Sequence, residues 1–189
     1  RLLNIDSSVK LVGFAANLLP HKRPRLFLRA AKAVTERCGW KIYFPIVGDT
    51  SHNEATLLKK MIVDLELEKI CPVIGARVPL SPTLSCFDIL VVTATNEGLG
   101  RTVIEAMLLK IPVVATDEGG HAEIIEDGVT GFLVSANDLD AQVEKICLLL
   151  SNEVLREQIV EAAYVFASKR YSPVAHVGCV RNIYRRLVK

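Results

Sequence analysis

Short apolar runs alternate with stretches of helical periodicity along most of this 189-residue sequence. The runs are rich in β-branched residues and end near Gly, Asp, Thr or Ser, which is typical of buried parallel strands. Six runs of this kind cover residues 10–14, 41–47, 71–74, 88–93, 112–115 and 131–134. Helical periodicity covers residues 24–36, 54–65, 100–110, 121–126 and 139–150. The alternation predicts an α/β fold, a Rossmann-like, doubly wound parallel sheet of about six strands with helices on both faces.

Two further helices follow this alternating part. The pattern is helical over residues 153–169 and again from about Ser172 to Leu187, with Ser172-Pro173 as a start signal. The length and the half-apolar composition suit one compact domain, residues 1–189. A doubly wound sheet binds ligands outside the carboxyl ends of its strands, so we expect functional residues in the strand-to-helix loops.

The composition argues against several other classes of protein. The 23 Lys and Arg residues are balanced by 21 Asp and Glu residues, so the chain lacks the positive charge of a dedicated nucleic-acid binder. No apolar run reaches the roughly 18–20 residues that cross a bilayer, and no charged-then-apolar leader opens the sequence, so we expect a soluble, cytoplasmic domain. The cysteines have no CxxC spacing, which predicts reduced thiols with neither a zinc site nor a disulfide framework. They are Cys38, Cys71, Cys86, Cys147 and Cys179.

The loop ATNEGLG leaves the strand predicted at 88–93 and enters the helix RTVIEAMLLK. Gly98 and Gly100 allow a sharp bend with positive φ and let a ligand approach the bare backbone. The free N–H groups of Leu99 to Thr102 then open the helix, where unsatisfied donors and the helix dipole favour an anion such as phosphate. This loop is therefore a candidate phosphate-binding site.

Two carboxylates flank the candidate phosphate site. Glu97 lies at the mouth of the loop, where a carboxylate suits hydroxyl groups because it offers acceptors and no donors. Glu105 follows eight residues later, in the second turn of the helix, and its side chain leans back toward the loop. Each glutamate taken alone has a plainer explanation, as a solvated charge or as a favourable charge near the helix start. Together they predict a phosphorylated sugar as the ligand.

A resemblance to family 4 of the glycosyltransferases is carried by residues 96–134, which read NEGLGRTVIEAMLLKIPVVATDEGGHAEIIEDGVTGFLV. This stretch contains that family's glutamate motif, EAM helix, PVVAT strand, GG-x-x-E turn and DG-x-TG-F-L-V hairpin, in order. Further matches are LLPHKRPRLFLRAA, IVGD and CPVIGARV upstream, and SNEVLREQIVEAA and YSPVAHVGCVRNIYRRL downstream. The resemblance covers nearly all of the chain and implies the C-terminal, donor-binding half of a retaining enzyme with the two-domain GT-B fold.

The resemblance also implies roles for individual residues. Glu105 would hold the ribose hydroxyls of the donor nucleotide, and Glu97 would contact the transferred sugar. Lys22 of PHKRP occupies the position of a lysine that clamps the diphosphate. Further donor contacts are implied for Gly98, Leu99, Gly100, Arg101 and Thr102, mainly through backbone N–H groups, and for Arg77 and Val78 of GARVP, beside the nucleobase.

One position departs from the family pattern. Five residues before Lys22, where relatives have an arginine on the diphosphate, this sequence has Asn17. A neutral amide cannot replace the bidentate grip of a guanidinium on phosphate, so weaker diphosphate binding is expected. His21, Arg23 and Arg25 are candidates for compensation, although a solvated helix start more often explains such residues.

Other polar residues are placed outside the main site. Gly119, Gly120 and Glu123 fit the family pattern, but the turn and the helix start that they form are enough to explain them. Asp117 and Glu118 are adjacent without a DxD-type pair, so we predict a site that needs neither a metal ion nor another cofactor. The histidines lack metal-like spacing and are expected on the surface or at helix caps. They are His21, His52, His121 and His176.

For the parent enzyme, the resemblance implies transfer of a hexose-type sugar from a UDP-, GDP- or ADP-sugar to a hydroxyl of a glycan or lipid-linked saccharide, as in polysaccharide biosynthesis. Lys22 and the backbone N–H groups would stabilise the charge on the leaving diphosphate. The acceptor would be held by an N-terminal domain that this sequence lacks. This agrees with the start at Arg1, from which we expect the sequence to be cut from a longer protein. The last helix would cross onto that domain, and its basic end, RNIYRRLVK, suits either an anionic membrane surface or simply a helix C-terminus.

Two alternatives stay open. A GT-B-fold nucleotide-sugar epimerase or phosphorylase would share the architecture, although the glutamate pair argues against it. A non-catalytic nucleotide-binding module is the second alternative, and Asn17 favours it if the diphosphate site has decayed.

Overall fold

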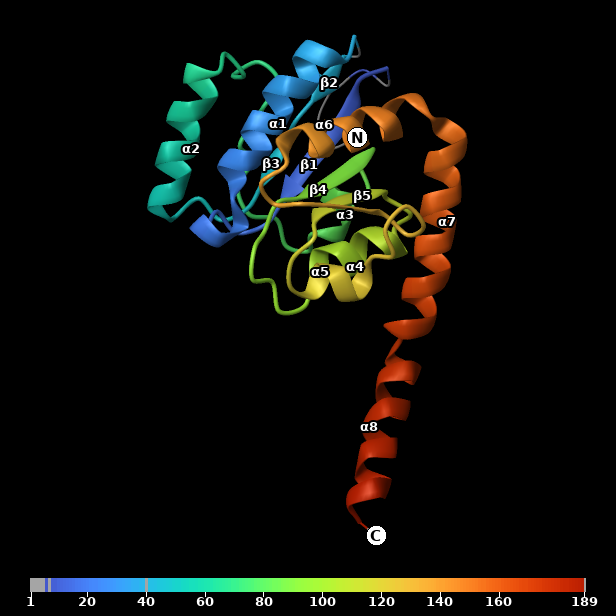
Figure 1. Cartoon of the computed structure of the whole chain (residues 1–189). Coiled ribbons are helices and arrows are strands. Elements are labelled where there is room, and N and C mark those ends of the chain that lie inside the picture. Colours follow the sequence, from blue (N-terminus) through green and yellow to red (C-terminus); the bar gives the residue numbers. More distant parts are fainter. Residues whose placement is uncertain (1–5, 7, 40, 189) are drawn as a thin grey trace.

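The computed structural model describes residue 6 and residues 8–39 and 41–188. Arg1, where the sequence predicts a cut, lies outside the described residues. The described chain forms one six-stranded parallel sheet with helices packed against it and a long C-terminal helix that projects from it (Figure 1). The predicted α/β architecture is confirmed.

The sheet has the strand order β2-β1-β4-β5-β6, and β3 also pairs with β1. Its strands are β1 (Lys10–Ala15), β2 (Ile42–Tyr43), β3 (Ile46–Val47), β4 (Ile89–Val92), β5 (Val113–Thr116) and β6 (Phe132–Val134). The chain leaves β1 for one side of the sheet and returns to β4 on the other side. The carboxyl ends of β1 and β4 are therefore the point at which the strand order switches, where a ligand is expected in this type of fold.

Helices cover both faces of the sheet. One face carries α1 (Pro24–Arg37), α2 (Asn53–Asp64) and α6 (Leu139–Ser151), and the other carries α3 (Ser81–Leu84), α4 (Arg101–Leu108), α5 (Gly120–Ile124) and α7 (Glu153–Arg170). Val12 and Phe14 of β1 belong to the hydrophobic cluster of the first face, whereas Leu11 and Ala15 belong to that of the second. Successive residues of β1 thus serve opposite faces, as the two-residue period of a strand requires.

Two predicted strands differ from the structure at proline residues. The run at 41–47 is divided into β2 and β3 at Pro45, and the run at 71–74 forms only an isolated bridge between Ile46 and Val73. Pro45 and Pro72 have no backbone N–H to donate to a neighbouring strand, which interrupts the pairing. The short helix α3 and the 3-10 helix η1 (Pro20–Lys22) have no counterpart in the sequence prediction.

The prediction of reduced thiols is wrong for one pair of cysteines. Cys38, at the end of α1, forms a disulfide with Cys147 of α6, and their Cα atoms lie 6.6 Å apart. The two residues are separated by 109 positions in the sequence and meet because α1 packs against α6. Cys71 is a free, buried cysteine, and burial raises the pKa of its thiol to about 12.

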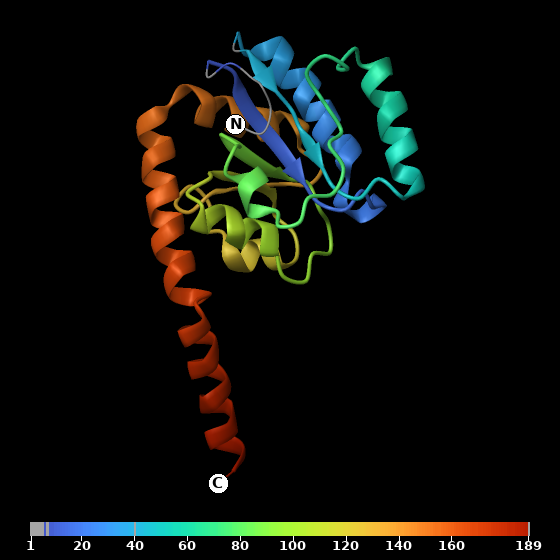
Figure 2. The same cartoon turned by 180° about the vertical axis from the view of Figure 1, so that it is seen from behind.

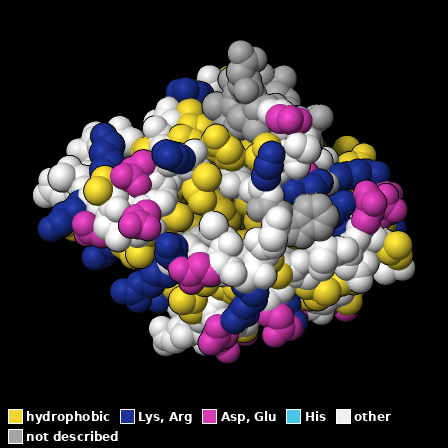
Figure 3. Space-filling view, turned by 90° about the horizontal axis from the view of Figure 1, so that it is seen from above, with side chains coloured by type: hydrophobic (Ala, Val, Ile, Leu, Met, Phe, Trp, Pro, Cys, Tyr) yellow, Lys and Arg dark blue, Asp and Glu magenta, His cyan; other side chains and the backbone are white. Residues whose placement is uncertain are grey.

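The helix α8 (Pro173–Leu187) extends away from the sheet, as Figures 1 and 2 show from opposite sides. None of its residues is buried, and its exposed apolar side chains include Val174, Ile183 and Leu187. In the part of the chain that the structure describes, no helix is long and apolar enough to cross a membrane. Figure 3 shows the end of the molecule opposite α8, where basic and acidic side chains are interspersed.

Candidate functional site

A cavity of about 280 Å³ lies at the carboxyl ends of β1 and β4. Its walls come from the ends of these strands, the end of β3, the loop at residues 76–80 and the start of α4. Most of the residues that the sequence predicts for the site line it, namely Asn17, Lys22, Arg77, Val78, Glu97, Leu99, Gly100, Arg101 and Thr102. The cavity therefore occupies the switch point of the sheet, where the fold places ligands.

The loop between β4 and α4 presents backbone N–H groups at this cavity. The Arg101 N–H donates to the Leu99 carbonyl at 2.6 Å, and the Ile104 N–H donates to the Gly100 carbonyl at 3.1 Å. The N–H groups of Thr102 and Val103 have no acceptor among the described residues. Unpaired donors at the positive end of a helix favour an anion, so this geometry suits a phosphate group.

The glycines of this loop differ from the prediction in their backbone conformation. Neither Gly98 nor Gly100 has a positive φ, which occurs instead at Asn96 (57°) and at Gly119 (57°). At Gly98 an added Cβ would meet open space, whereas at Gly100 it would lie 3.0 Å from Cδ2 of His121. The expectation of positive φ at these glycines is therefore wrong. Gly100 leaves room for the His121 ring, and Gly98 leaves the backbone open.

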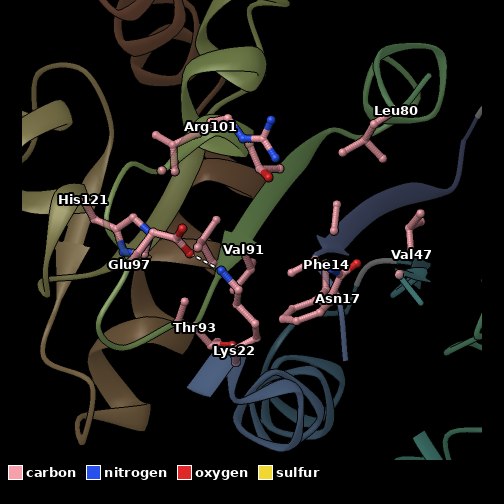
Figure 4. A pocket seen from close by; sticks show the side chains of 18 of the residues that line it. Phe14, Asn17, Lys22, Val47, Leu80, Val91, Thr93, Glu97, Arg101 and His121 are labelled. Carbon is pink, nitrogen blue, oxygen red and sulfur yellow. Dashed lines mark hydrogen bonds and ion pairs between the residues drawn. The ribbon is translucent and has the colours of Figure 1, made fainter. Parts of the chain in front are cut away.

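Lys22 and Glu97 meet in the cavity and form an ion pair (Figure 4). Lys22 ends η1, and this short helix is tied to the end of β4. The Thr93 hydroxyl donates to the Lys22 carbonyl at 2.7 Å, and the Thr95 N–H donates to the His21 carbonyl at 2.8 Å. The two predicted catalytic side chains, which come from loops 75 residues apart, are therefore held face to face.

Gly119 and Gly120 support the Glu97 loop from behind. The Gly120 N–H donates to the Glu97 carbonyl at 2.7 Å. A Cβ at Gly119 would lie 2.5 Å from that same carbonyl oxygen, and a Cβ at Gly120 would lie 2.7 Å from the Gly98 carbonyl oxygen. Both glycines thus allow the α5 turn to approach the Glu97 backbone, which goes beyond the turn-shaping role that the sequence predicts.

His121 is a site residue that the sequence prediction places wrongly on the surface or at a cap. Its side chain is completely buried and lines the cavity. Nδ1 lies 3.2 Å from the Thr116 carbonyl oxygen, and Nε2 has no partner among the described residues. Burial lowers the pKa of His121, while the Thr116 carbonyl and Glu97 act in the opposite direction and Lys22 adds to the lowering. The signal in the sequence is its place directly after Gly119-Gly120, in the strand-to-helix connection that follows β5.

Glu105 does not line the cavity. It is half-buried on α4 and, like Gly98, is not among the residues that line the cavity. The contact with a ribose that the resemblance implies for Glu105 would therefore lie outside this cavity. Val78, on the loop at 76–80, is 96% exposed and offers an open surface beside the cavity.

The basic residues that were candidates to compensate for Asn17 are not brought to the cavity. Asn17 itself lines the cavity beside Lys22. Arg23 and Arg25 instead line a separate depression together with Arg29, and the Arg25 Nε donates to Glu54 at 2.7 Å. The preferred interpretation, a helix start outside the site, therefore fits Arg23 and Arg25 better than compensation at the cavity does. In the described part of the chain, no group of three or more His, Cys, Asp and Glu residues is placed to hold a metal ion.

Comparisons with known proteins agree with this geometry. Residues 2–166 match the family model described as Glycosyl transferases group 1. The chain is 32% identical over 164 residues to a poly(ribitol-phosphate) alpha-N-acetylglucosaminyltransferase of Staphylococcus aureus (strain COL), covering 86% of this chain and 33% of that protein. It is 30% identical over 193 residues to a D-inositol 3-phosphate glycosyltransferase of Corynebacterium urealyticum, covering 99% of this chain and 45% of that protein. The chain thus spans less than half the length of these relatives.

Solved structures share the fold. The structure of Anabaena HepE in complex with UDP and glucose matches with a TM-score of 0.86 at 25% identity, covering 95% of this chain and 49% of that one. A glycosyltransferase from Rickettsia africae matches with a TM-score of 0.90 at 26% identity, covering 97% of this chain and 49% of that one. These structural neighbours are GT-B glycosyltransferases, and the chain belongs to the group 1 family of glycosyl transferases.

Proposed function

We propose that this chain is the donor-binding domain of a retaining, family 4 glycosyltransferase that transfers a sugar from a nucleoside diphosphate sugar to an acceptor hydroxyl. The observation that carries the proposal is the convergence of unpaired N–H groups at the start of α4 with the Lys22–Glu97 pair in one cavity. A cluster of this kind offers donors and a cation to a diphosphate and a carboxylate to sugar hydroxyls. The HepE structure, which contains UDP and glucose, supports the choice of ligand.

The residues divide between the parts of the donor. Thr102, Val103 and Lys22 bind the diphosphate, and Lys22 exchanges Glu97 for a phosphate oxygen when the donor enters. Glu97 then accepts hydrogen bonds from the transferred sugar. Glu105 holds the ribose outside the cavity, and the loop of Arg77 and Val78 lies beside the nucleobase, as the family resemblance implies. The fixed N–H dipoles and the ammonium stabilise the charge that grows on the diphosphate as the glycosidic bond breaks, without a metal ion.

The acceptor is assigned to an N-terminal GT-B domain of the parent protein, which would hold a glycan or a lipid-linked saccharide at the cytoplasmic face of a membrane. Transfer needs both reactants in near-attack geometry, and such positioning can account for roughly 7–11 kcal/mol of the barrier. The chain alone is therefore expected to bind a nucleotide and to transfer a hexosyl group only very slowly. Robust transfer by these 189 residues alone would contradict this division between the domains.

A second candidate, a non-catalytic nucleotide-binding module, is favoured by one observation. Asn17 lines the cavity where relatives have an arginine, and Arg23 and Arg25 point elsewhere. Such a module would bind the nucleotide but would remain without transfer activity after fusion to the N-terminal domain.

The test is calorimetric titration of the chain with UDP, GDP and ADP, which also identifies the nucleobase. Replacing Lys22 by Met should weaken binding of the preferred diphosphate by roughly 1.5–3 kcal/mol, because a charged hydrogen bond is lost. Lys59→Met, at an exposed position of α2 away from the cavity, is the matched control and should leave the affinity unchanged. Absence of binding to all three nucleotides would refute the proposal, and transfer by the joined domains separates an enzyme from a module.

A further inference from the structure

His121 combines complete burial with an unpaired nitrogen, in a residue that lines the cavity. Its side chain is 0% exposed, it lines the cavity, and Nε2 has no hydrogen-bond partner among the described residues. Buried polar atoms of folded proteins are nearly always paired, and an unpaired one destabilises the fold. A buried, unpaired atom in a binding cavity therefore indicates a group that the ligand supplies.

The hydrogen bond at the other nitrogen fixes what that group can be. Nδ1 lies 3.2 Å from the Thr116 carbonyl oxygen, which can only accept. Nδ1 therefore carries the ring proton, and in the neutral imidazole Nε2 is left with a lone pair and no proton. The partner of Nε2 must accordingly be a hydrogen-bond donor.

The surroundings keep the ring neutral and in place. Desolvation of the buried ring disfavours the charged imidazolium, and the Lys22 ammonium adds to this effect. Glu97 and Glu118 act in the opposite direction, and the ordinary pKa from which the shift starts is 6.5. Gly100 packs against the ring edge, since a Cβ there would lie 3.0 Å from Cδ2 of His121. The ring edge therefore lies close to the start of α4, and the Nδ1 contact with the Thr116 carbonyl sets its orientation.

The proposed function assigns the ribose to Glu105 and the nucleobase to the loop of Arg77 and Val78, which leaves the diphosphate and the transferred sugar beside His121. At neutral pH a diphosphate presents acceptors, as do the Glu97 carboxylate oxygens, so neither can pair with Nε2. Sugar hydroxyl groups are donors. Figure 4 shows the Glu97 carboxylate between the His121 ring and Lys22, so a sugar that displaces the Lys22–Glu97 pair reaches both the carboxylate and the ring.

We propose that Nε2 of His121 accepts a hydrogen bond from a hydroxyl group of the transferred sugar and thereby selects the sugar of the donor. This inference rests on the proposed function. Glu97 accepts from a second hydroxyl, so the pair recognises a sugar that carries two hydroxyl groups on the side facing α5. The nucleoside diphosphate itself makes no use of His121.

Two substitutions separate the acceptor role from the packing role. His121→Asn keeps an N–H near the Nδ1 position for the Thr116 carbonyl but has no acceptor at the Nε2 position. His121→Gln extends its amide to the Nε2 position and offers an acceptor oxygen there. Both variants are titrated calorimetrically with UDP, GDP and ADP and with UDP-glucose, GDP-glucose and ADP-glucose, after circular dichroism has shown that they are folded.

We expect His121→Asn to weaken binding of the preferred sugar nucleotide by about five- to tenfold, which corresponds to the loss of one hydrogen bond, while leaving the affinity for the bare diphosphate unchanged. His121→Gln should recover part of the loss. Deoxyfluoro sugars give an independent check on the wild-type chain, because fluorine cannot donate. Fluorine at the contacting position should lower the wild-type affinity by a similar factor and have no further effect in the Asn variant.

Equal losses for the sugar nucleotide and the bare diphosphate would overturn the proposal, since His121 would then only support the fold of the site. Additive effects of the fluorine and of the Asn substitution would overturn it as well. Either result would leave the proposed function intact if the diphosphate still binds. A chain that binds no nucleoside diphosphate would overturn both.

Discussion

The contact between the α5 turn and the Glu97 loop can be tested by replacing Gly119 with Ala. Gly119 has φ 57° and ψ −137°, a conformation that is almost confined to glycine. The added Cβ would also lie 2.5 Å from the Glu97 carbonyl oxygen and 3.0 Å from its nitrogen. Both atoms belong to the backbone, so no side-chain rotation relieves the contact.

The cost of this substitution has two parts. The backbone conformation contributes about 1–3 kcal/mol, as other positions of this kind do. The steric contact contributes a further 1–3 kcal/mol or so, the usual cost of overpacking. Gly128→Ala is a control without the steric contact, because Gly128 also has a positive φ (74°) but an added Cβ there meets no atom within 4 Å. We expect Gly119→Ala to lower the free energy of unfolding by about 1–3 kcal/mol more than Gly128→Ala does.

Urea unfolding of both variants and the parent chain measures these differences, and calorimetry with the preferred nucleotide sugar measures the effect on the site. Gly119→Ala should also weaken binding of the sugar nucleotide, because relief of the contact moves Glu97, whereas Gly128→Ala should not. Equal destabilisation by the two substitutions, with unchanged binding in both, would refute the idea that the α5 turn supports the Glu97 loop.

Three further outcomes are expected. Glu105→Ala should weaken binding of the preferred nucleoside diphosphate by roughly 1–3 kcal/mol if Glu105 holds the ribose; an unchanged dissociation constant in a folded variant would exclude that role. Asn17→Arg should tighten diphosphate binding, since a second cation joins Lys22 at the phosphates. Calorimetry would contradict this if Asn17→Arg and Lys22→Ala both leave the affinity for the diphosphate unchanged. The free energy of unfolding should fall as the pH drops from about 7 to 5, because unfolded His121 takes up a proton near its ordinary pKa of 6.5, whereas burial lowers the pKa of His121 in the folded chain. Urea unfolding at both pH values measures this decrease, which should be smaller in His121→Asn.

Most of the fold could be predicted from local patterns because strands and helices impose their own periods on the sequence. Leu11 to Ala15 alternate between the two faces of the sheet, and that period is visible without any tertiary information. The prediction of a strand at 71–74 is wrong because it rests on the apolar character of the run, whereas Pro72 removes a hydrogen-bond donor and leaves only an isolated bridge. The Cys38–Cys147 disulfide could not be predicted, since it depends on how α1 packs against α6.

The site was predictable to the extent that it is built from one continuous segment. Glu97 and the N–H groups at the start of α4 follow each other in the chain, so the bend after β4 predicts their arrangement. His121 and the glycines before it reach the same place from another strand-to-helix loop. Only the parallel order of β4 and β5, which sets both loops at one edge of the sheet, shows that His121 and Glu97 are neighbours.

The balance of charge in the cavity bears on the absence of an arginine at position 17. The cavity wall carries three cationic side chains, Lys22, Arg77 and Arg101, against one carboxylate, that of Glu97, while burial keeps His121 neutral. The overall chain is nearly neutral, with a formal charge of +2, so this excess is a local feature. The family resemblance implies donor contacts for Arg77 and Arg101, but the motif around Lys22 alone does not contain these two charges because both residues are distant in sequence from Asn17. A diphosphate that enters the cavity would therefore meet a positive site despite Asn17, which agrees with the proposed exchange of Glu97 for a phosphate oxygen at Lys22.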